Sequence, residues 1–247
     1  MTASRRENSD AVSSESKSSR VVTPIVALDV SDGAAAREIV TRLGDRCRFY
    51  KVGLELFTAG GYFELVEWLV KRGNRVFADL KLYDIPETVR RAVANLRGCG
   101  ASFLTVHGHR SVMEAAAREK GAMKILAVTV LTSFDQRDLD EMGTTKTVAD
   151  LVLARARGAV ETGCDGVIAS GLEAKALKSE FKDRLLIVTP GIRPVQQADD
   201  QKRTVDVAQA FANGADYIVV GRPIRDAADP RAAAEAIQKT ISGIFRQ

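Results

Sequence analysis

The chain has 247 residues, a hydrophobic content of 45% and a formal net charge of +4 at pH 7. This length is compatible either with one large α/β barrel or with two smaller domains. Lys and Arg are scattered and form no long basic run, which argues against a nucleic-acid partner. No apolar stretch reaches the roughly 18 residues of a membrane-spanning helix, and no secretory signal is recognisable. We therefore expect a cytoplasmic protein without a membrane partner.

The cysteine pattern gives no indication of a metal site. Cys47, Cys99 and Cys164 match neither a CxxC pair nor the Cys/His spacing of zinc proteins. Reduced thiols and the absence of a bound metal are the expectation.

Residues 1–20 are rich in serine and mixed charge and hold almost no large apolar side chain, which predicts a disordered tail. Residues 21–247 are predicted to form the folded domain. Eight runs rich in β-branched or aromatic residues predict strands at Ile25–Val30, Arg48–Val52, Arg75–Asp79, Ser102–His107, Lys124–Val130, Gly166–Ala169, Leu185–Val188 and Tyr217–Val220. Apolar residues at helical spacing between them predict helices, among them 34–43, 63–72, 87–96, 148–162 and 205–213. Glycines follow these helices as expected C-caps, at Gly44, Gly73, Gly98, Gly163 and Gly214.

Alternating strands and helices indicate a parallel sheet with right-handed crossovers. Eight such units in about 225 residues fit one closed (β/α)8 TIM barrel, while an open doubly wound sheet is the competing architecture. No GxGxxG follows the first strand, which weakens the second alternative. Pro86, Pro190, Pro194 and Pro223 fall just after strands 3, 7 and 8, where barrel enzymes carry their functional loops.

Charged residues end three consecutive strands. Asp79 and Lys81 are two residues apart, so their side chains are expected on the same side of strand 3. Lys51 and Asp29 hold corresponding positions near the ends of strands 2 and 1. Asp84 follows the strand, and geometry alone does not say where its carboxylate points. A surface ion pair before a helix N-terminus is the simpler alternative.

The run 79–88, DLKLYDIPET, resembles the D-x-K-x-x-D-I-P-x-T signature of orotidine 5′-monophosphate decarboxylases. The resemblance extends over nearly everything except the tail, through VALDV (26–30), YKVGLELF (50–57), VTVLTS (128–133), TPGIRP (189–194), DQKR (200–203) and GRP (221–223). It implies a cofactor-free and metal-free decarboxylation of orotidine 5′-monophosphate to UMP, the last step of de novo UMP synthesis.

The resemblance also implies a role for each motif residue. The catalytic array is Lys51, Asp79, Lys81 and Asp84, and Asp84 reaches the active site of the other subunit of a homodimer. Lys81 is expected to stabilise the negative charge that develops at C6 of the pyrimidine and then to protonate it.

A second set of residues is implied to bind the nucleotide substrate. Asp29 and Lys51 are expected at the ribose, Thr132 and Ser133 at the pyrimidine, and four residues at the phosphate. The full implied set is Asp29, Lys51, Ile85, Thr88, Thr132, Ser133, Pro190, Arg193, Gln201, Gly221 and Arg222, with the phosphate contacts at Arg193, Gln201, Gly221 and Arg222. Simpler roles exist for several of them: a helix cap for Asp29, a local turn for Thr132–Ser133 and a type II turn for Pro190–Gly191.

Two further functions compete with this interpretation. One is a magnesium-dependent sugar-phosphate decarboxylase or synthase of the same barrel type, such as a keto-gulonate phosphate decarboxylase or a hexulose phosphate synthase, whose related motif lacks the I-P-x-T continuation. The other is a non-catalytic nucleotide-binding barrel. His107 and His109 follow strand 4, but the expected chemistry does not need an imidazole, so a structural role is favoured for both.

Overall fold

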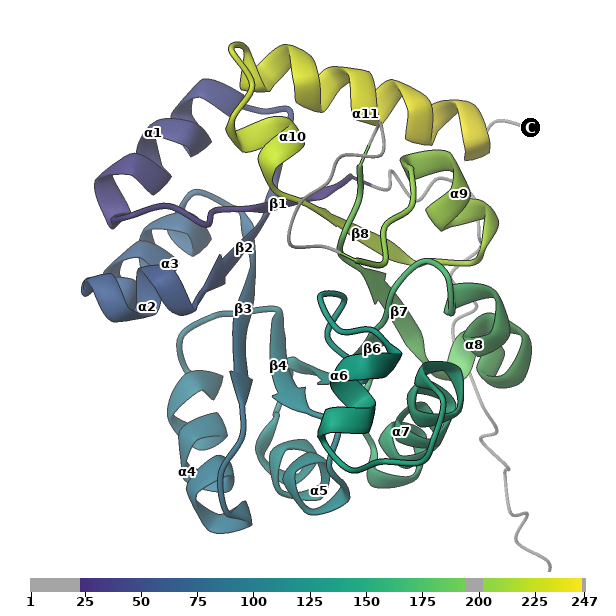
Figure 1. Ribbon diagram of the computed structural model, residues 1–247. Helices are drawn as coiled ribbons and strands as arrows, with labels where there is room; N and C mark the ends of the chain where they lie inside the picture. Colours follow the sequence, from purple (N-terminus) through teal and green to yellow (C-terminus); the bar gives the residue numbers. More distant parts are fainter. Residues whose placement is uncertain (1–22, 194–201, 246–247) are drawn as a thin grey trace, which may run out of the picture.

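The computed structural model describes residues 23–193 and 202–245, so the predicted tail over residues 1–20 lies outside the described residues. In the described part, parallel strands pair in chain order and β8 pairs with β1, which closes an eight-stranded barrel (Figure 1). The strands are β1 (Ile25–Ala27), β2 (Phe49–Gly53), β3 (Arg75–Leu82), β4 (Phe103–His107), β5 (Lys124–Val128), β6 (Gly166–Ile168), β7 (Leu186–Thr189) and β8 (Tyr217–Val220). The predicted single-domain (β/α)8 barrel is therefore confirmed.

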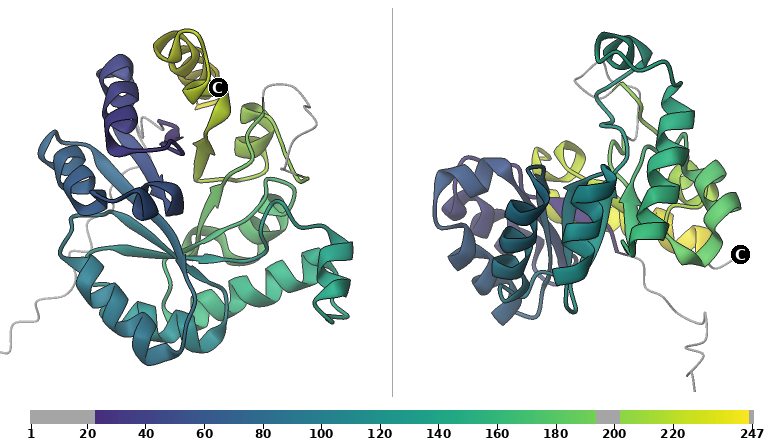
Figure 2. Two further views of the ribbon diagram at one scale, coloured as in Figure 1. Left: turned by 60° about the vertical axis from the view of Figure 1, so that its left-hand side comes forward. Right: turned by 90° about the horizontal axis from the view of Figure 1, so that it is seen from below.

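Helices surround the strands as an outer layer (Figures 1 and 2). They are α1 (Gly33–Leu43), α2 (Leu54–Ala59), α3 (Tyr62–Lys71), α4 (Pro86–Arg97), α5 (Arg110–Glu119), α6 (Gln136–Glu141), α7 (Val148–Thr162), α8 (Ala174–Phe181), α9 (Val207–Ala212), α10 (Arg222–Arg225) and α11 (Pro230–Phe245), with a short 3-10 turn at Lys182–Arg184. Within the described ranges, no helix has the length and apolar character needed to cross a membrane.

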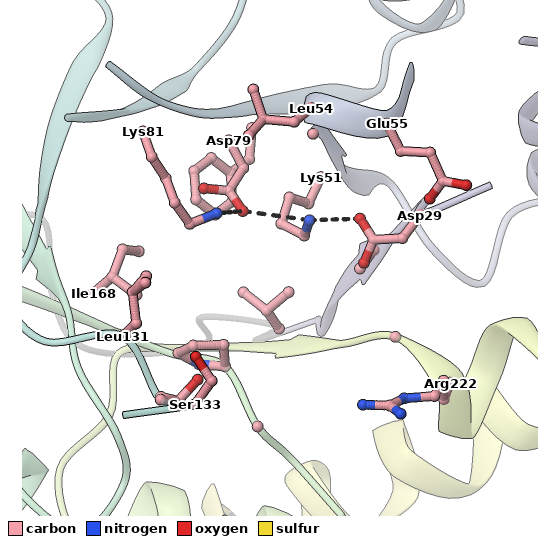
Figure 3. A pocket seen from close by; sticks show the side chains of 18 of the residues that line it. Asp29, Lys51, Leu54, Glu55, Asp79, Lys81, Leu131, Ser133, Ile168 and Arg222 are labelled. Carbon is pink, nitrogen blue, oxygen red and sulfur yellow. Dashed lines mark hydrogen bonds and ion pairs between the residues drawn. The ribbon is translucent and has the colours of Figure 1, made fainter. Parts of the chain in front are cut away.

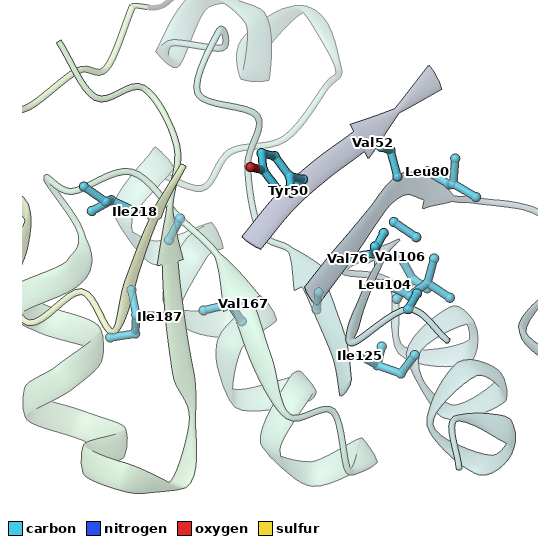
Figure 4. Close-up of a cluster of buried hydrophobic side chains, with 14 of the residues drawn as sticks. Tyr50, Val52, Val76, Leu80, Leu104, Val106, Ile125, Val167, Ile187 and Ile218 are labelled. Atoms are coloured by element: carbon cyan, nitrogen blue, oxygen red, sulfur yellow. The ribbon is translucent and has the colours of Figure 1, made fainter. Parts of the chain in front are cut away.

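Alternation of side chains along the strands creates two separate apolar cores. One set of strand residues, including Tyr50, Val76 and Ile125, faces outward and packs under the helices (Figure 4). The alternate set, including Phe49, Phe77 and Phe103, fills the barrel interior. At the N-terminal ends of the strands, the Arg75 guanidinium lies 4.1 Å from the centroid of the Phe49 ring. The interior is therefore filled at that end, and a cavity has room only near the C-terminal ends.

The strand boundaries differ from prediction mainly in β1 and β3. β1 ends at Ala27 instead of Val30, whereas β3 runs on to Leu82. Lys81 lies inside this extension with a φ of 46°, a left-handed conformation that is uncommon for a residue with a side chain. The pairing register with β4 shifts between Ala78 and Leu82. Strand 3 is therefore irregular at the position that carries Lys81.

The predicted glycine caps differ in conformation. Gly163 ends α7 with a φ of 82°, the left-handed geometry expected of a C-cap, while Gly98 ends α4 with a φ of −81° that other residues adopt readily. The three cysteines are free, and burial raises the pKa of Cys47 to about 12 and that of Cys164 to about 11. Neither buried thiol is therefore a ready nucleophile.

Close packing between β6 and β7 generates a stability prediction. A β carbon on Gly166 would lie 2.6 Å from the carbonyl oxygen of Leu186 and 2.8 Å from a methyl carbon of Leu126. We expect Gly166→Ala to lower the free energy of unfolding by about 1–3 kcal/mol, because backbone must move to admit the methyl group. Urea denaturation measures this loss. Gly98→Ala is the matched control, since a β carbon there meets nothing within 4 Å; equal effects of the two substitutions would contradict the packing argument.

Candidate active site

A cavity of about 400 Å³ opens at the C-terminal ends of the strands. Its floor consists of inward-facing apolar residues such as Ala27, Val128 and Val219, which belong to or adjoin the interior core. On β2 and β3, Lys51 and Asp79 come two residues after the interior residues Phe49 and Phe77. The alternation of side chains therefore places these two charged groups above the apolar floor. The cavity thus combines an apolar base with a charged upper wall, and its volume suits a small organic ligand.

Four charged side chains form a continuous row along one wall (Figure 3). The Lys81 ammonium lies 2.8 Å from Asp79 Oδ2, and the Lys51 ammonium lies 3.3 Å from the same oxygen. Lys51 also donates a 2.8 Å hydrogen bond to Asp29 Oδ1. The order Lys81, Asp79, Lys51, Asp29 alternates in sign, so each charge has an opposite neighbour. The sequence prediction that these strand ends converge is confirmed for this set.

Burial and charge act in opposite directions on the two central groups. Burial alone lowers the pKa of Lys51, but the carboxylates of Asp79 and Asp29 outweigh it and raise the pKa overall. Burial raises the pKa of Asp79, but Lys51 and Lys81, helped by a hydroxyl hydrogen bond, bring it below its usual range. Both groups are therefore charged at neutral pH although the Asp79 residue is only 8% exposed.

Thr105 belongs to this network and was not predicted from the sequence. Its hydroxyl donates a 2.8 Å hydrogen bond to Asp79 Oδ1 and accepts one of 2.9 Å from the Lys81 backbone N–H. One fully buried side chain on β4 thus fixes the carboxylate and the irregular backbone of β3. A threonine inside an apolar strand gives no motif, and only its position opposite Asp79 reveals its role.

Most of the predicted nucleotide-binding residues line the same cavity. Ser133 and Leu131 lie across the cavity from the charged row, and Arg222 lies at one side of it, on α10 (Figure 3). The predicted residues that line the cavity besides the charged row are Thr132, Ser133, Pro190, Arg193, Gly221 and Arg222. The structure adds Glu55 and Arg225, which the sequence analysis did not single out. Arg225 donates a hydrogen bond of 2.6 Å to the backbone carbonyl of Asp29.

Three predicted site residues lie outside the cavity of their own chain. Asp84, Ile85 and Thr88 are exposed at the start of α4, and the Asp84 carboxylate accepts a 2.6 Å hydrogen bond from the Ile85 N–H. Their predicted roles require a second subunit and stay predictions. Gln201, a further predicted site residue, lies outside the described residues.

The two histidines do not line the cavity. The Tyr83 ring lies against both imidazoles, with centroid separations of 5.0 Å to His107 and 4.9 Å to His109. Burial, followed by the positive charge of Arg155, lowers the pKa of each imidazole. These contacts agree with the structural role favoured for both. No group of three or more His, Cys, Asp or Glu side chains in the described ranges is placed to hold a metal ion.

The lowered pKa of Asp79 generates a pH prediction. A lowered folded-state pKa contributes stability above about pH 4, where an unfolded aspartate is ionised, and this contribution is lost as the pH falls through the folded pKa. We expect Asp79→Asn to cost about 3 kcal/mol at pH 7, because it leaves two ammonium groups without their shared counter-charge. Urea denaturation from pH 7 to pH 3 should show this difference shrinking in acid. Asp183→Asn, at a side chain that is 80% exposed, is the control and should change stability by less than about 0.5 kcal/mol throughout. A difference for Asp79→Asn that is independent of pH would refute the assigned ionisation.

Comparisons with known proteins agree with the site. Residues 23–237 match the family model described as orotidine 5'-phosphate decarboxylase / HUMPS family. The chain is 58% identical over 223 residues to a Methylococcus capsulatus protein named orotidine 5'-phosphate decarboxylase, covering 90% of this chain and 92% of that protein. A Stenotrophomonas maltophilia protein of the same name is 52% identical over 221 residues, covering 88% and 92% respectively.

A solved structure agrees with these sequence matches. The crystal structure of orotidine 5'-phosphate decarboxylase from Lactobacillus acidophilus matches with a TM-score of 0.79 at 38% identity, covering 89% of this chain and 98% of that one. Sequence, fold and site motifs therefore agree that the chain belongs to the orotidine 5'-phosphate decarboxylase / HUMPS family.

Proposed function

We propose that the protein decarboxylates orotidine 5′-monophosphate to uridine 5′-monophosphate and carbon dioxide, as the last step of de novo UMP synthesis. The observation that carries this proposal is the Lys81 ammonium at the cavity, held 2.8 Å from a buried carboxylate in a row of alternating charges. Relatives at 58% and 52% identity that carry the decarboxylase name support it.

The proposed reaction needs charge stabilisation more than any other aid. The bond between C6 and the substrate carboxylate breaks, the electron pair stays on C6, and carbon dioxide leaves. An ammonium beside C6 lowers the energy of that carbanion, and its effect is large where water is excluded. Lys81 then donates a proton to C6, which completes UMP, and the neutral amine regains a proton from solvent. Asp79 and Thr105 hold the ammonium and its backbone in place.

The rest of the cavity offers groups for each part of the nucleotide. Asp29 and Lys51 can meet ribose hydroxyls, and Thr132 and Ser133 form the wall proposed for the uracil edge. Arg193, Arg222 and the backbone at Gly221 are proposed to bind the phosphate, where guanidinium groups supply charge-assisted hydrogen bonds. Gln201 is proposed as a further phosphate ligand. Binding energy from the phosphate can then be used to order the reacting end.

We also propose that two chains form a homodimer with shared active sites. Asp84 does not reach the cavity of its own chain, and its neighbours Tyr83 and Ile85 are 60% and 66% exposed. Exposed apolar side chains beside a charged motif residue favour burial against a second copy. Asp84, Ile85 and Thr88 would then complete the cavity of the partner. The cytoplasmic location of the enzyme stays a prediction from the sequence.

The role of Lys81 is tested by Lys81→Ala. We expect turnover of orotidine 5′-monophosphate to fall by at least about 10⁴-fold, because the substitution removes both the charge stabilisation and the proton donor. UMP binding should persist within about tenfold, since the phosphate and ribose contacts remain. An ultraviolet assay in buffer with a strong chelator measures turnover, and calorimetry measures UMP affinity. Near-normal turnover by the variant would refute the assignment, and loss of wild-type activity to the chelator would point to the magnesium-dependent sugar-phosphate enzymes.

The shared site is tested by mixing two inactive variants, Lys81→Ala and Asp84→Ala. After subunit exchange, half of the dimers are hybrids, and each hybrid has one intact site, so about a quarter of all sites should regain activity. Exchange is verified with differently tagged chains, and mixing two batches of Lys81→Ala is the control. No recovery despite proven exchange would show that Asp84 does not act across the interface.

A further inference from the structure

Arg203, which lies between β7 and α9, has an unusual set of contacts. Arg203 is only 8% exposed and does not line the cavity. Its Nη1 lies 2.6 Å from Glu173 Oε1, at the start of α8. Its Nη2 donates to the backbone carbonyls of Val130 at 3.1 Å and Leu131 at 3.0 Å. One buried guanidinium therefore joins the loop after β6 to the loop after β5.

The main chain of Arg203 adds two more connections. Its N–H donates a 3.2 Å hydrogen bond to the carbonyl of Thr132, and its carbonyl accepts one of 3.2 Å from the Ser170 hydroxyl. Side chain and backbone together thus contact three successive carbonyls, those of Val130, Leu131 and Thr132. Leu131, Thr132 and Ser133 line the cavity, and Leu131 and Ser133 lie across it from the charged row (Figure 3). Arg203 therefore contacts the wall proposed for the uracil edge from the side away from the cavity.

The ion pair between Arg203 and Glu173 joins only one guanidinium nitrogen to one carboxylate oxygen. A guanidinium placed only to neutralise a carboxylate commonly presents two parallel N–H groups to both oxygens. Here Nη2 is directed to the two carbonyls instead, and Glu173 Oε2 and Arg203 Nε are buried without a hydrogen-bond partner in the described part of the chain. Leaving buried polar atoms unpaired is unfavourable. The hydrogen bonds from Nη2 to the loop after β5 therefore take the place of a second hydrogen bond to Glu173.

We propose that Arg203, oriented by Glu173, is a positioning residue that sets the uracil-recognising wall at Leu131–Ser133. This inference rests on the proposed function, because it assigns that wall to the pyrimidine. Arg203 does not touch the substrate in this role; it keeps Thr132 and Ser133 where they can meet the ring. Replacing Arg203 should lower the affinity for ligands that carry the base and leave the affinity for ligands without the base nearly unchanged.

The test replaces both partners, as Glu173→Met with Arg203→Met. A single Arg203→Ala change leaves the Glu173 carboxylate buried and unpaired and endangers folding, whereas two apolar residues of similar volume often keep stability. Thermal unfolding verifies the fold. Calorimetry then compares UMP with ribose 5-phosphate, which shares the phosphate and sugar but lacks the base. We expect UMP affinity to fall by about tenfold or more and ribose 5-phosphate affinity to change by less than about twofold.

A matched control uses the Arg157–Glu180 ion pair, which joins α7 to α8 and lies away from the cavity. Changing both of these residues to Met removes the same charges and should leave both affinities within about twofold. Arg203→Lys keeps the charge but loses the planar fork, so its UMP affinity should be intermediate.

The two affinities together distinguish a positioning role from a general structural one. Equal weakening of both ligands would mean that the pair only supports the fold, and unchanged affinities in a folded double variant would mean that the wall is held by other contacts; each result overturns the inference. If the wild-type protein itself neither binds UMP nor turns over orotidine 5′-monophosphate, the proposed function fails and the inference fails with it.

Discussion

A carboxylate that must stay charged inside the barrel governs the structure of this site. Asp79 is almost fully buried, and its burial alone would favour the neutral acid. Two ammonium groups within 3.3 Å and the Thr105 hydroxyl reverse that preference. Because Asp79 stays ionised, it holds Lys81 and Lys51 in fixed positions, and the ammonium groups in turn need it. The two central charges, Lys51 and Asp79, are thus stabilised mainly by their charged neighbours rather than by water.

The barrel supplies this arrangement through the period of its strands. Inward-facing positions alternate with outward-facing ones along each strand. Lys51 on β2 and Asp79 on β3 therefore point into the same cavity, two residues after the interior residues Phe49 and Phe77. Parallel pairing brings these ends together, with Gly53 opposite Asp79 in the register. The irregular β3 backbone at Lys81 departs from this simple pattern, and the hydrogen bond from its N–H to Thr105 stabilises the departure. The uncommon conformation thus occurs at the residue proposed to carry the chemistry.

The opposite wall is built by a different principle. It comes from loops, and loops lack the ladder of hydrogen bonds that fixes a strand. Arg203 and Glu173 supply buried polar contacts in place of such a ladder, and Arg225 does the same for the Asp29 backbone on the other side. The cavity therefore combines a rigid charged row on strands with loop walls that are cross-linked by arginines. Such preorganisation suits a reaction whose main requirement is electrostatic stabilisation.

The eight strands were predictable from the amino-acid sequence, because apolar periodicity is a local property of the chain. The sequence favoured a closed barrel over an open sheet, and the expected convergence of Asp29, Lys51, Asp79 and Lys81 depended on that barrel. The family motif also located Thr132, Ser133, Arg193 and Arg222, which line the cavity. The contacts of Thr105 and Arg203 and the left-handed backbone of Lys81 emerged only in the folded chain. These features depend on which residues of distant strands and loops lie opposite one another. The spacing of residues within a single segment does not show which residues will be opposite.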